Sequence, residues 1–218
     1  VWAGTSQEAT CYRNAPAAGP TPCGGIACGR LAVAVRRETM DEAANIFLVG
    51  PMGSGKTAVG KQLARALGLP FVDSDAEIEQ RTGVDIPLIF DKEGEAGFRT
   101  REREVIADLV MRRGIVLSTG GGAILLPENQ EALRSHGTVV YLKTSVAQQA
   151  RRVRRSANRP LLAGAEDPSV RLAALMSQRA PLYEGVAHLT VSTDGSRVGG
   201  VVARILGQLP DHRILPRL

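Results

Sequence analysis

From residue 46 onward, short apolar runs alternate with longer segments whose apolar residues recur with the period of a helix. The short runs predict strands at Ile46–Val49, Pro70–Val72, Ile115–Ser118, Val139–Leu142 and Leu189–Val191. The longer segments predict helices at Lys56–Leu67, Asp75–Thr82, Phe98–Arg112, Glu128–Ser135, Val146–Arg155, Ser169–Tyr183 and Ser196–Leu206. This alternation predicts an α/β fold, a parallel five-stranded sheet with helices on both faces. Ligands of such folds bind at the carboxyl ends of the strands, so the loops there are the first place to seek function.

Residues 1–39 differ from the rest, because they are rich in Ala, Gly and Pro and show no sustained period. The three cysteines of the chain all lie in this segment, and their odd number and loose spacing predict neither a zinc site nor a disulfide framework. We expect a disordered N-terminal extension, added at the start site or by cloning, with a targeting peptide as the alternative. One domain is expected over residues 40–212.

The composition of the chain argues against a membrane protein and against a nucleic-acid-binding protein. Hydrophobic residues make up 44% of the 218-residue chain, which is typical of a globular protein, and no apolar run approaches the roughly 20 residues of a membrane span. The net charge of +5 could suit nucleic acid, but the arginines are scattered and aromatic residues make up only 4%. We therefore expect a cytoplasmic, monomeric enzyme for anionic substrates, with neither a nucleic-acid nor a membrane partner.

The residues from Gly50 to Thr57 read Gly-Pro-Met-Gly-Ser-Gly-Lys-Thr and match the phosphate-loop pattern between the first predicted strand and helix. Gly53 and Gly55 let the backbone turn so that its N–H groups converge, and the following helix points its positive end at the same place. Lys56 can reach the β- and γ-phosphates, and the Thr57 hydroxyl can bind Mg²⁺. The motif predicts a nucleotide site.

Two carboxylates, Asp73 and Asp75, follow the second predicted strand. They could serve a magnesium shell and a substrate hydroxyl, or Asp75 could simply cap the next helix.

Arg99 falls in the first turn of the helix predicted from Phe98, where a cation is electrostatically disfavoured. Anion binding would explain it, with Glu102 holding the guanidinium, and a surface ion pair is the alternative.

Three further segments carry polar or glycine signals. Gly120–Gly122 removes every side chain from the end of the third strand, which predicts close approach of a substrate. The basic run Arg151–Arg155 leads to Arg159 and predicts a mobile lid, or else a solvated face. Arg179 ends a predicted helix, where it could simply complement the helix dipole.

The motifs GPMGSGKT, DSD, FRTRE, TGGG, RPLL and RAPLY occur in this order, and together they resemble shikimate kinase from about Ile46 to Leu206. The resemblance implies a nucleoside-monophosphate-kinase-like fold with core, substrate-binding and lid regions. It also implies ATP-dependent phosphorylation of the 3-hydroxyl of shikimate, a step of aromatic amino acid biosynthesis, with ATP and Mg²⁺ required. The chain departs from some relatives at Val198, where they have a proline against adenine.

The resemblance also implies residue roles. Catalysis would fall to Lys56, Asp75 and Arg159. Nucleotide contacts would come from Gly53, Ser54, Gly55, Lys56, Thr57, Ala58, Arg152 and Arg159. Shikimate would be bound by Asp75, Arg99, Gly120, Gly121, Gly122 and Arg179. Magnesium would be held by Thr57 directly and by Asp73 through water.

Two other functions remain open from the residues alone. A gluconate kinase or another small-molecule kinase would share the phosphate loop without needing both Arg99 and Arg179. A non-catalytic nucleotide sensor or a nucleic-acid-binding module would show binding without turnover.

Overall fold

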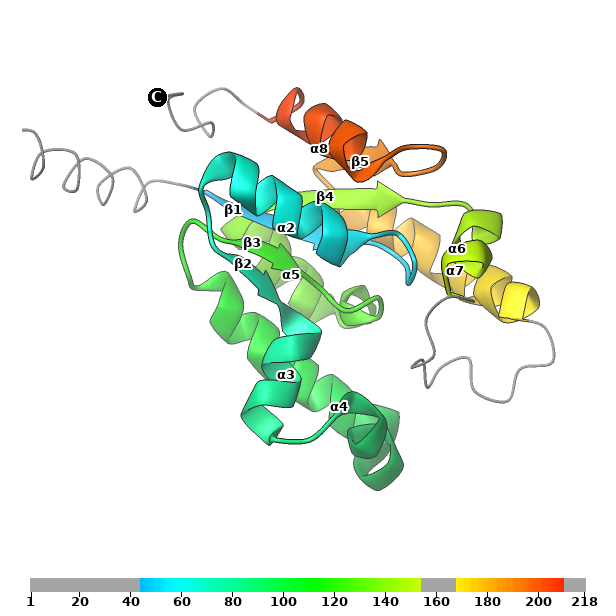
Figure 1. Ribbon diagram of the computed structural model, residues 1–218. Helices are drawn as coiled ribbons and strands as arrows, with labels where there is room; N and C mark the ends of the chain where they lie inside the picture. Colours follow the sequence, from blue (N-terminus) through cyan, green and yellow to red (C-terminus); the bar gives the residue numbers. More distant parts are fainter. Residues whose placement is uncertain (1–43, 154–167, 210–218) are drawn as a thin grey trace, which may run out of the picture.

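The structure, a computed structural model, describes residues 44–153 and 168–209 (Figure 1). The strands are β1 (Asn45–Val49), β2 (Phe71–Asp73), β3 (Val116–Ser118), β4 (Gly137–Lys143) and β5 (Leu189–Ser192). The helices are α2 (Lys56–Leu67), α3 (Ser74–Thr82), α4 (Ile86–Val110), the 3₁₀ helix η1 (Ala123–Leu125), α5 (Pro127–His136), α6 (Val146–Val153), α7 (Pro168–Val186) and α8 (Val198–Leu206).

The five strands form one sheet in the order β2-β3-β1-β4-β5, and every pair is parallel. In the central strand, Ile46 is in register with Val116 of β3 on one side and with Thr138 of β4 on the other. All five residues of β1 are buried, as a strand covered on both faces requires. The predicted fold class is confirmed.

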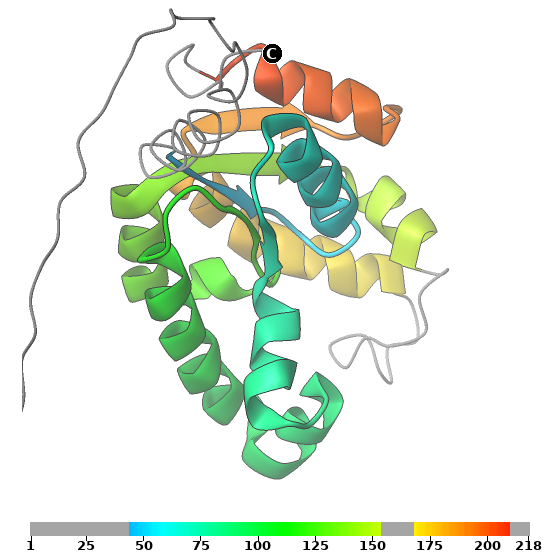
Figure 2. The ribbon, with the colours of Figure 1, turned by 60° about the vertical axis from the view of Figure 1, so that its left-hand side comes forward.

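Successive side chains of β1 enter two different cores because strand residues alternate between faces. Phe47 and Val49 pack into a core with residues of α3, α4, α5 and α7, whereas Ile46 and Leu48 pack under α2 and α8. Figure 2 shows α2 and α8 on one side of the sheet and α4, α5 and α7 on the other. The two layers hold the sheet rigid and leave the carboxyl ends of its strands for a site.

The helix predicted from Phe98 begins at Ile86, so that prediction was wrong by about three turns. Asp85 caps this helix by accepting a hydrogen bond from the Leu88 backbone N–H at 3.1 Å. The helix axis breaks at Gly94, whose φ of 70° lies in the left-handed region. The chain resumes its helix after this single residue.

The helix predicted to end at Tyr183 runs on to Val186, with Pro181 inside it. No helix within residues 44–153 and 168–209 is both long and apolar enough to cross a membrane. The predicted extension over residues 1–39, Arg159 of the predicted lid and the end of the helix predicted to reach Arg155 lie outside the described residues.

Candidate active site

A cavity of about 570 Å³ lies at the carboxyl ends of β1, β2 and β3. Its wall is formed by the phosphate loop at one end and by α3, α4, the Gly120–Gly122 turn and Arg179 at the other. Most predicted site residues that the structure describes line it, namely Gly53, Gly55, Lys56, Thr57, Ala58, Asp73, Asp75, Arg99, Gly120, Gly121, Gly122, Arg152 and Arg179. The volume suits a small-molecule site.

The phosphate loop has the backbone geometry that its sequence predicts. Gly53 and Gly55 have φ values of 76° and 93°, a region that residues with side chains rarely adopt. The Lys56 ammonium donates to the backbone carbonyls of Gly50 at 2.7 Å and Pro51 at 3.0 Å. These contacts lay the lysine across the loop, where its charge faces the anion-binding end of the cavity.

Thr57 and Asp73 lie together beside the phosphate loop, since the Thr57 hydroxyl donates to Asp73 Oδ2 at 3.0 Å. The other carboxylate oxygen of Asp73 accepts from the Asp75 backbone N–H at 3.1 Å and so caps α3. The suggestion that Asp75 is the cap was therefore wrong. Capping by Asp73 leaves the Asp75 side chain in the first helical turn, where it lines the cavity.

The Thr57–Asp73 pair fits Mg²⁺ bound together with a phosphate. Within the described residues, no group of three or more His, Cys, Asp or Glu side chains could hold a metal ion on its own. Magnesium at phosphoryl-transfer sites takes one or two protein oxygens and completes its shell with phosphate and water. One hydroxyl and one carboxylate next to a phosphate loop meet that requirement.

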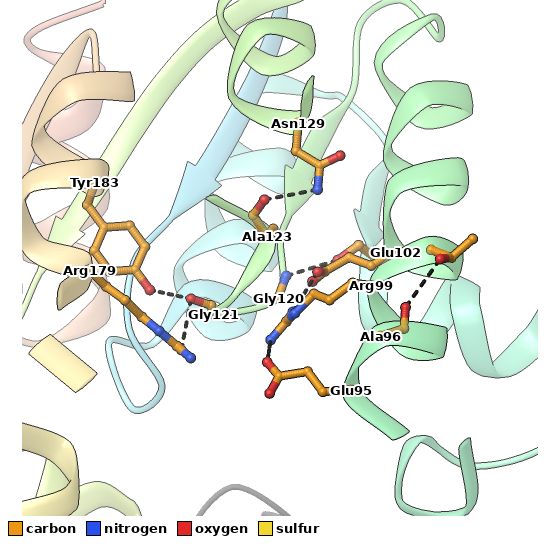
Figure 3. A network of polar contacts seen from close by, with 12 residues as sticks. Glu95, Ala96, Arg99, Glu102, Gly120, Gly121, Ala123, Asn129, Arg179 and Tyr183 are labelled. Carbon is orange, nitrogen blue, oxygen red and sulfur yellow. Dashed lines mark hydrogen bonds and ion pairs between the residues drawn. The ribbon is translucent and has the colours of Figure 1, made fainter. Parts of the chain in front are cut away.

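Arg99 reaches the cavity from α4 and is held by two carboxylates (Figure 3). Its Nη1 donates to Glu102 Oε2 at 2.6 Å and its Nη2 donates to Glu95 Oε1 at 2.9 Å. Burial alone would lower the pKa of Arg99, but the charges of Glu102 and Glu95 outweigh it and raise the pKa. The expected support from Glu102 is confirmed, whereas Arg99 lies a full turn beyond the kink at Gly94 and not at a helix start.

The Gly120–Gly122 turn has no room for side chains at Gly120 and Gly122. A Cβ on Gly120 would lie 2.7 Å from both Asp75 Oδ1 and Glu102 Oε1, and one on Gly122 would collide with the Arg99 guanidinium. The close approach predicted for these glycines is therefore made in this structure by the chain's own charged groups. Without side chains at 120 and 122, Asp75, Glu102 and Arg99 can all converge on one side of the turn.

Arg179 and Tyr183 meet the same turn from α7 (Figure 3). The Tyr183 hydroxyl donates to the Gly121 carbonyl, and Arg179 Nη1 lies 3.4 Å from that oxygen. Because α7 continues to Val186, Arg179 does not sit in the last turn, and the dipole explanation for it was wrong. Tyr183 was not predicted as a site residue, although it lies four residues after Arg179 and therefore on the same helical face.

Phe90 and Phe98 form an apolar part of the wall, with ring centroids 4.8 Å apart. Neither was predicted as a site residue. The region around Phe90 was not predicted to be helical, so the spacing between Phe90 and Phe98 gave no reason to expect contact between the two rings.

The shikimate kinase family model matches residues 52–210. The shikimate kinase of Thioalkalivibrio sulfidiphilus is 56% identical over 166 residues, which is 76% of this chain and 87% of the relative. That of Hahella chejuensis is 56% identical over 169 residues, 78% of this chain and 88% of the relative. The chain belongs to the shikimate kinase family.

A solved shikimate kinase of Acinetobacter baumannii, in complex with shikimate, has the same fold. It superposes with a TM-score of 0.75 at 48% identity, and the match covers 79% of this chain and 99% of that one. The shikimate kinase of Aquifex aeolicus also matches, with a TM-score of 0.65 at 38% identity over 74% of this chain and 94% of that one. The family suggested by the ordered motifs is thus confirmed.

In this shikimate kinase family member, Arg152 joins the phosphate loop to Thr193. Its Nη1 donates to the Gly53 carbonyl at 2.9 Å, to the Ser54 carbonyl at 3.2 Å and to Thr193 Oγ1 at 3.1 Å. Arg152 thereby ties the phosphate loop to the segment after β5. Val198, at the first turn of α8, is 36% exposed.

Proposed function

We propose that the chain transfers the γ-phosphoryl group of ATP to the 3-hydroxyl of shikimate. The observation that carries this proposal is one cavity with a phosphate loop at one end and, at the other, a carboxylate and two arginines, Arg99 and Arg179. Such a cavity can align a polyanionic donor with an anionic alcohol.

The donor end neutralises phosphate charge. Lys56 and the N–H groups of the loop face the transferring phosphoryl group, which spreads negative charge over its oxygens in the transition state. Arg159 is proposed to add a second cation at the same group. Nucleotide contacts are proposed for Gly53, Ser54, Gly55, Thr57, Ala58 and Arg152.

The acceptor end orients the nucleophile. Asp75, in the first turn of α3, is proposed to accept a hydrogen bond from the reacting hydroxyl, because phosphoryl transfer asks for alignment more than for a strong base. Arg99 and Arg179 are proposed to bind the carboxylate. Within the described residues, the Nε atoms of both arginines are buried without a hydrogen-bond partner, and both side chains line the cavity.

Thr57 and Asp73 are proposed to hold Mg²⁺, Thr57 directly and Asp73 through water. The ion would bridge phosphate oxygens and neutralise charge that builds up there. Replacing Asp73 by Asn keeps a good helix cap while removing the charge, so Asp73→Asn should raise the Mg²⁺ requirement with little change in stability.

The proposal extends to the whole protein as a monomeric cytoplasmic enzyme without a nucleic-acid partner. Residues 40–212 should suffice for activity. A protein that lacks residues 1–39 is expected to keep the kcat and melting temperature of the full chain, because that segment has no periodic apolar face with which to join a core.

An acceptor panel tests the function. ADP release is measured with shikimate, gluconate, nucleoside monophosphates or no acceptor, at fixed ATP and Mg²⁺. Shikimate should give the highest kcat/KM by a wide margin. A preference for gluconate would replace the proposal by a related sugar-acid kinase, and ATP binding without turnover on any alcohol would replace it by a nucleotide sensor.

A further inference from the structure

Tyr183 is buried beside the acceptor end of the cavity, although it does not line the cavity itself. Its hydroxyl and the Arg179 guanidinium, one turn earlier on α7, both approach the backbone oxygen of Gly121 (Figure 3). The tyrosine makes the closer contact, while Arg179 Nη1 stays 3.4 Å away, at the limit of a hydrogen bond. The two side chains therefore share one acceptor unequally.

The position of the Gly121 carbonyl affects both ends of the site. A Cβ on Gly121 would lie 3.4 Å from the Met52 backbone nitrogen, so the turn packs against the phosphate loop. Gly120 and Gly122 pack against Asp75, Glu102 and Arg99. A turn of three glycines has no side chains of its own to fix it, so its conformation depends on what its backbone binds.

The tyrosine ring is held independently of its hydroxyl. It stacks on the ring of Tyr141 in β4, with centroids 5.1 Å apart and planes 13° from parallel. Burial raises the pKa of Tyr183 well above its usual value even though Arg179 lowers it, so the phenol stays protonated and remains a donor. Removing the hydroxyl alone should therefore leave the ring in place.

We infer that Tyr183 is a positioning residue whose hydroxyl occupies the Gly121 carbonyl and so leaves the Arg179 guanidinium for the carboxylate of the acceptor. The inference rests on the proposed function, because it assigns a task to the same arginine. Without the hydroxyl, the Gly121 oxygen loses its closer partner. The Arg179 Nη1 then moves the short distance onto that oxygen, since a buried carbonyl without a donor is unfavourable.

The test compares two isosteric variants, Tyr183→Phe and Tyr141→Phe. Tyr141 is the matched control, because its hydroxyl is equally buried and has no hydrogen-bond partner within the described residues. Tyr183→Phe should raise the KM for shikimate by at least about threefold, the value of one ordinary hydrogen bond, and leave the KM for ATP within about twofold. Tyr141→Phe should change neither constant.

A second substrate separates positioning from a general loss of structure. A shikimate analogue whose carboxylate is reduced to an alcohol cannot use Arg179 as a charge partner. Its KM should therefore rise less in Tyr183→Phe than the KM for shikimate does. Equal rises for both acceptors, or a rise in the KM for ATP as large as that for shikimate, would show a structural role and overturn the inference.

The outcomes also separate this inference from the proposed function. An unmodified protein that does not phosphorylate shikimate refutes the function. An active unmodified protein whose Tyr183→Phe variant matches Tyr141→Phe in all constants refutes the positioning role and leaves the function standing.

Discussion

Glu102 is completely buried and its carboxylate lies 2.6 Å from the guanidinium of Arg99, which is itself only 11% exposed. Burial raises the pKa of Glu102; the charges of Arg99 and Arg179 lower it, the charge of Asp75 raises it, and the net shift is upward. Desolvation thus outweighs the ion pair in setting the charge of this carboxyl. The acceptor end of the cavity is built on a group that is costly to keep ionised.

This balance predicts how stability depends on pH. Because the folded protein holds the Glu102 proton more tightly than the unfolded chain does, the contribution of this group is complete below its unfolded pKa and is lost as pH rises through the higher folded pKa. The free energy of unfolding of the parent minus that of Glu102→Gln should therefore fall as the pH rises above 4.5, the ordinary pKa of a glutamate.

Urea unfolding at several pH values measures this difference. Glu95→Gln is the control, since Glu95 also pairs with Arg99 but is 53% exposed. Glu95→Gln shows at each pH what the loss of an exposed partner of Arg99 does to stability. If the Glu102 difference were flat or rose with pH, attraction by the arginines would dominate over burial.

Lys56→Ala should lower kcat at least about 100-fold, because it removes a positive charge from the transferring phosphate. Its ammonium donates to the backbone carbonyls of Gly50 and Pro51, and the side chain belongs to neither core, so the far-ultraviolet circular dichroism should change little. Lys61→Ala on the same helix removes an exposed lysine and should retain parent activity. A folded Lys56→Ala protein with parent kcat would remove the loop from the mechanism.

Arg99→Ala should weaken the use of shikimate at least about tenfold with little change in the KM for ATP, since removing one partner of a buried charged contact typically costs about 2–5 kcal/mol. The analogue with an alcohol in place of the carboxylate should be a poor substrate for the parent. The variant should show much less additional loss with it, because the missing contact is already gone. An undiminished penalty in Arg99→Ala would mean that Arg99 does not bind the carboxylate.

Gly60 shows how closely α2 packs on the sheet. An alanine Cβ there would collide with the Phe71 ring and lie 3.1 Å from Leu48 Cδ1, so Gly60→Ala should destabilise the protein by about 1–3 kcal/mol despite better helix propensity. Gly200 in α8 is the matched control, because a Cβ there meets nothing within 4 Å. Gly200→Ala should stabilise by about 0.5–1 kcal/mol. Urea midpoints that move in the same direction for both would contradict this packing.

Local chemistry could predict the conformation of the phosphate loop but not the start of α4. Gly53 and Gly55 have positive φ, and the motif predicts this because it places glycine at both positions. The turns of α4 before Gly94 were missed, although Ile89 within them packs into the same core as Phe98. Burial in the tertiary structure can override the low helix propensity of a residue such as Gly94.

The role inferred for Tyr183 could not be predicted from the sequence. Its hydroxyl meets Gly121, 62 residues away in the chain, and no local pattern encodes such a contact. Similarly, Asp75 was the suggested cap of α3, and only the backbone geometry shows that Asp73 caps it. Residues whose task lies on their own element were predictable, and those that act across elements were not.

The position of the phosphate on the product decides whether the proposed reaction takes place. The protein is incubated with ATP, Mg²⁺ and shikimate, and the product is examined by phosphorus–proton correlation NMR while ADP is quantified. The account predicts a single phosphomonoester, equimolar with ADP, whose phosphorus couples to the proton on carbon 3 of shikimate. A phosphorus coupled to a proton on another carbon, or ADP formed equally fast without shikimate, would contradict it.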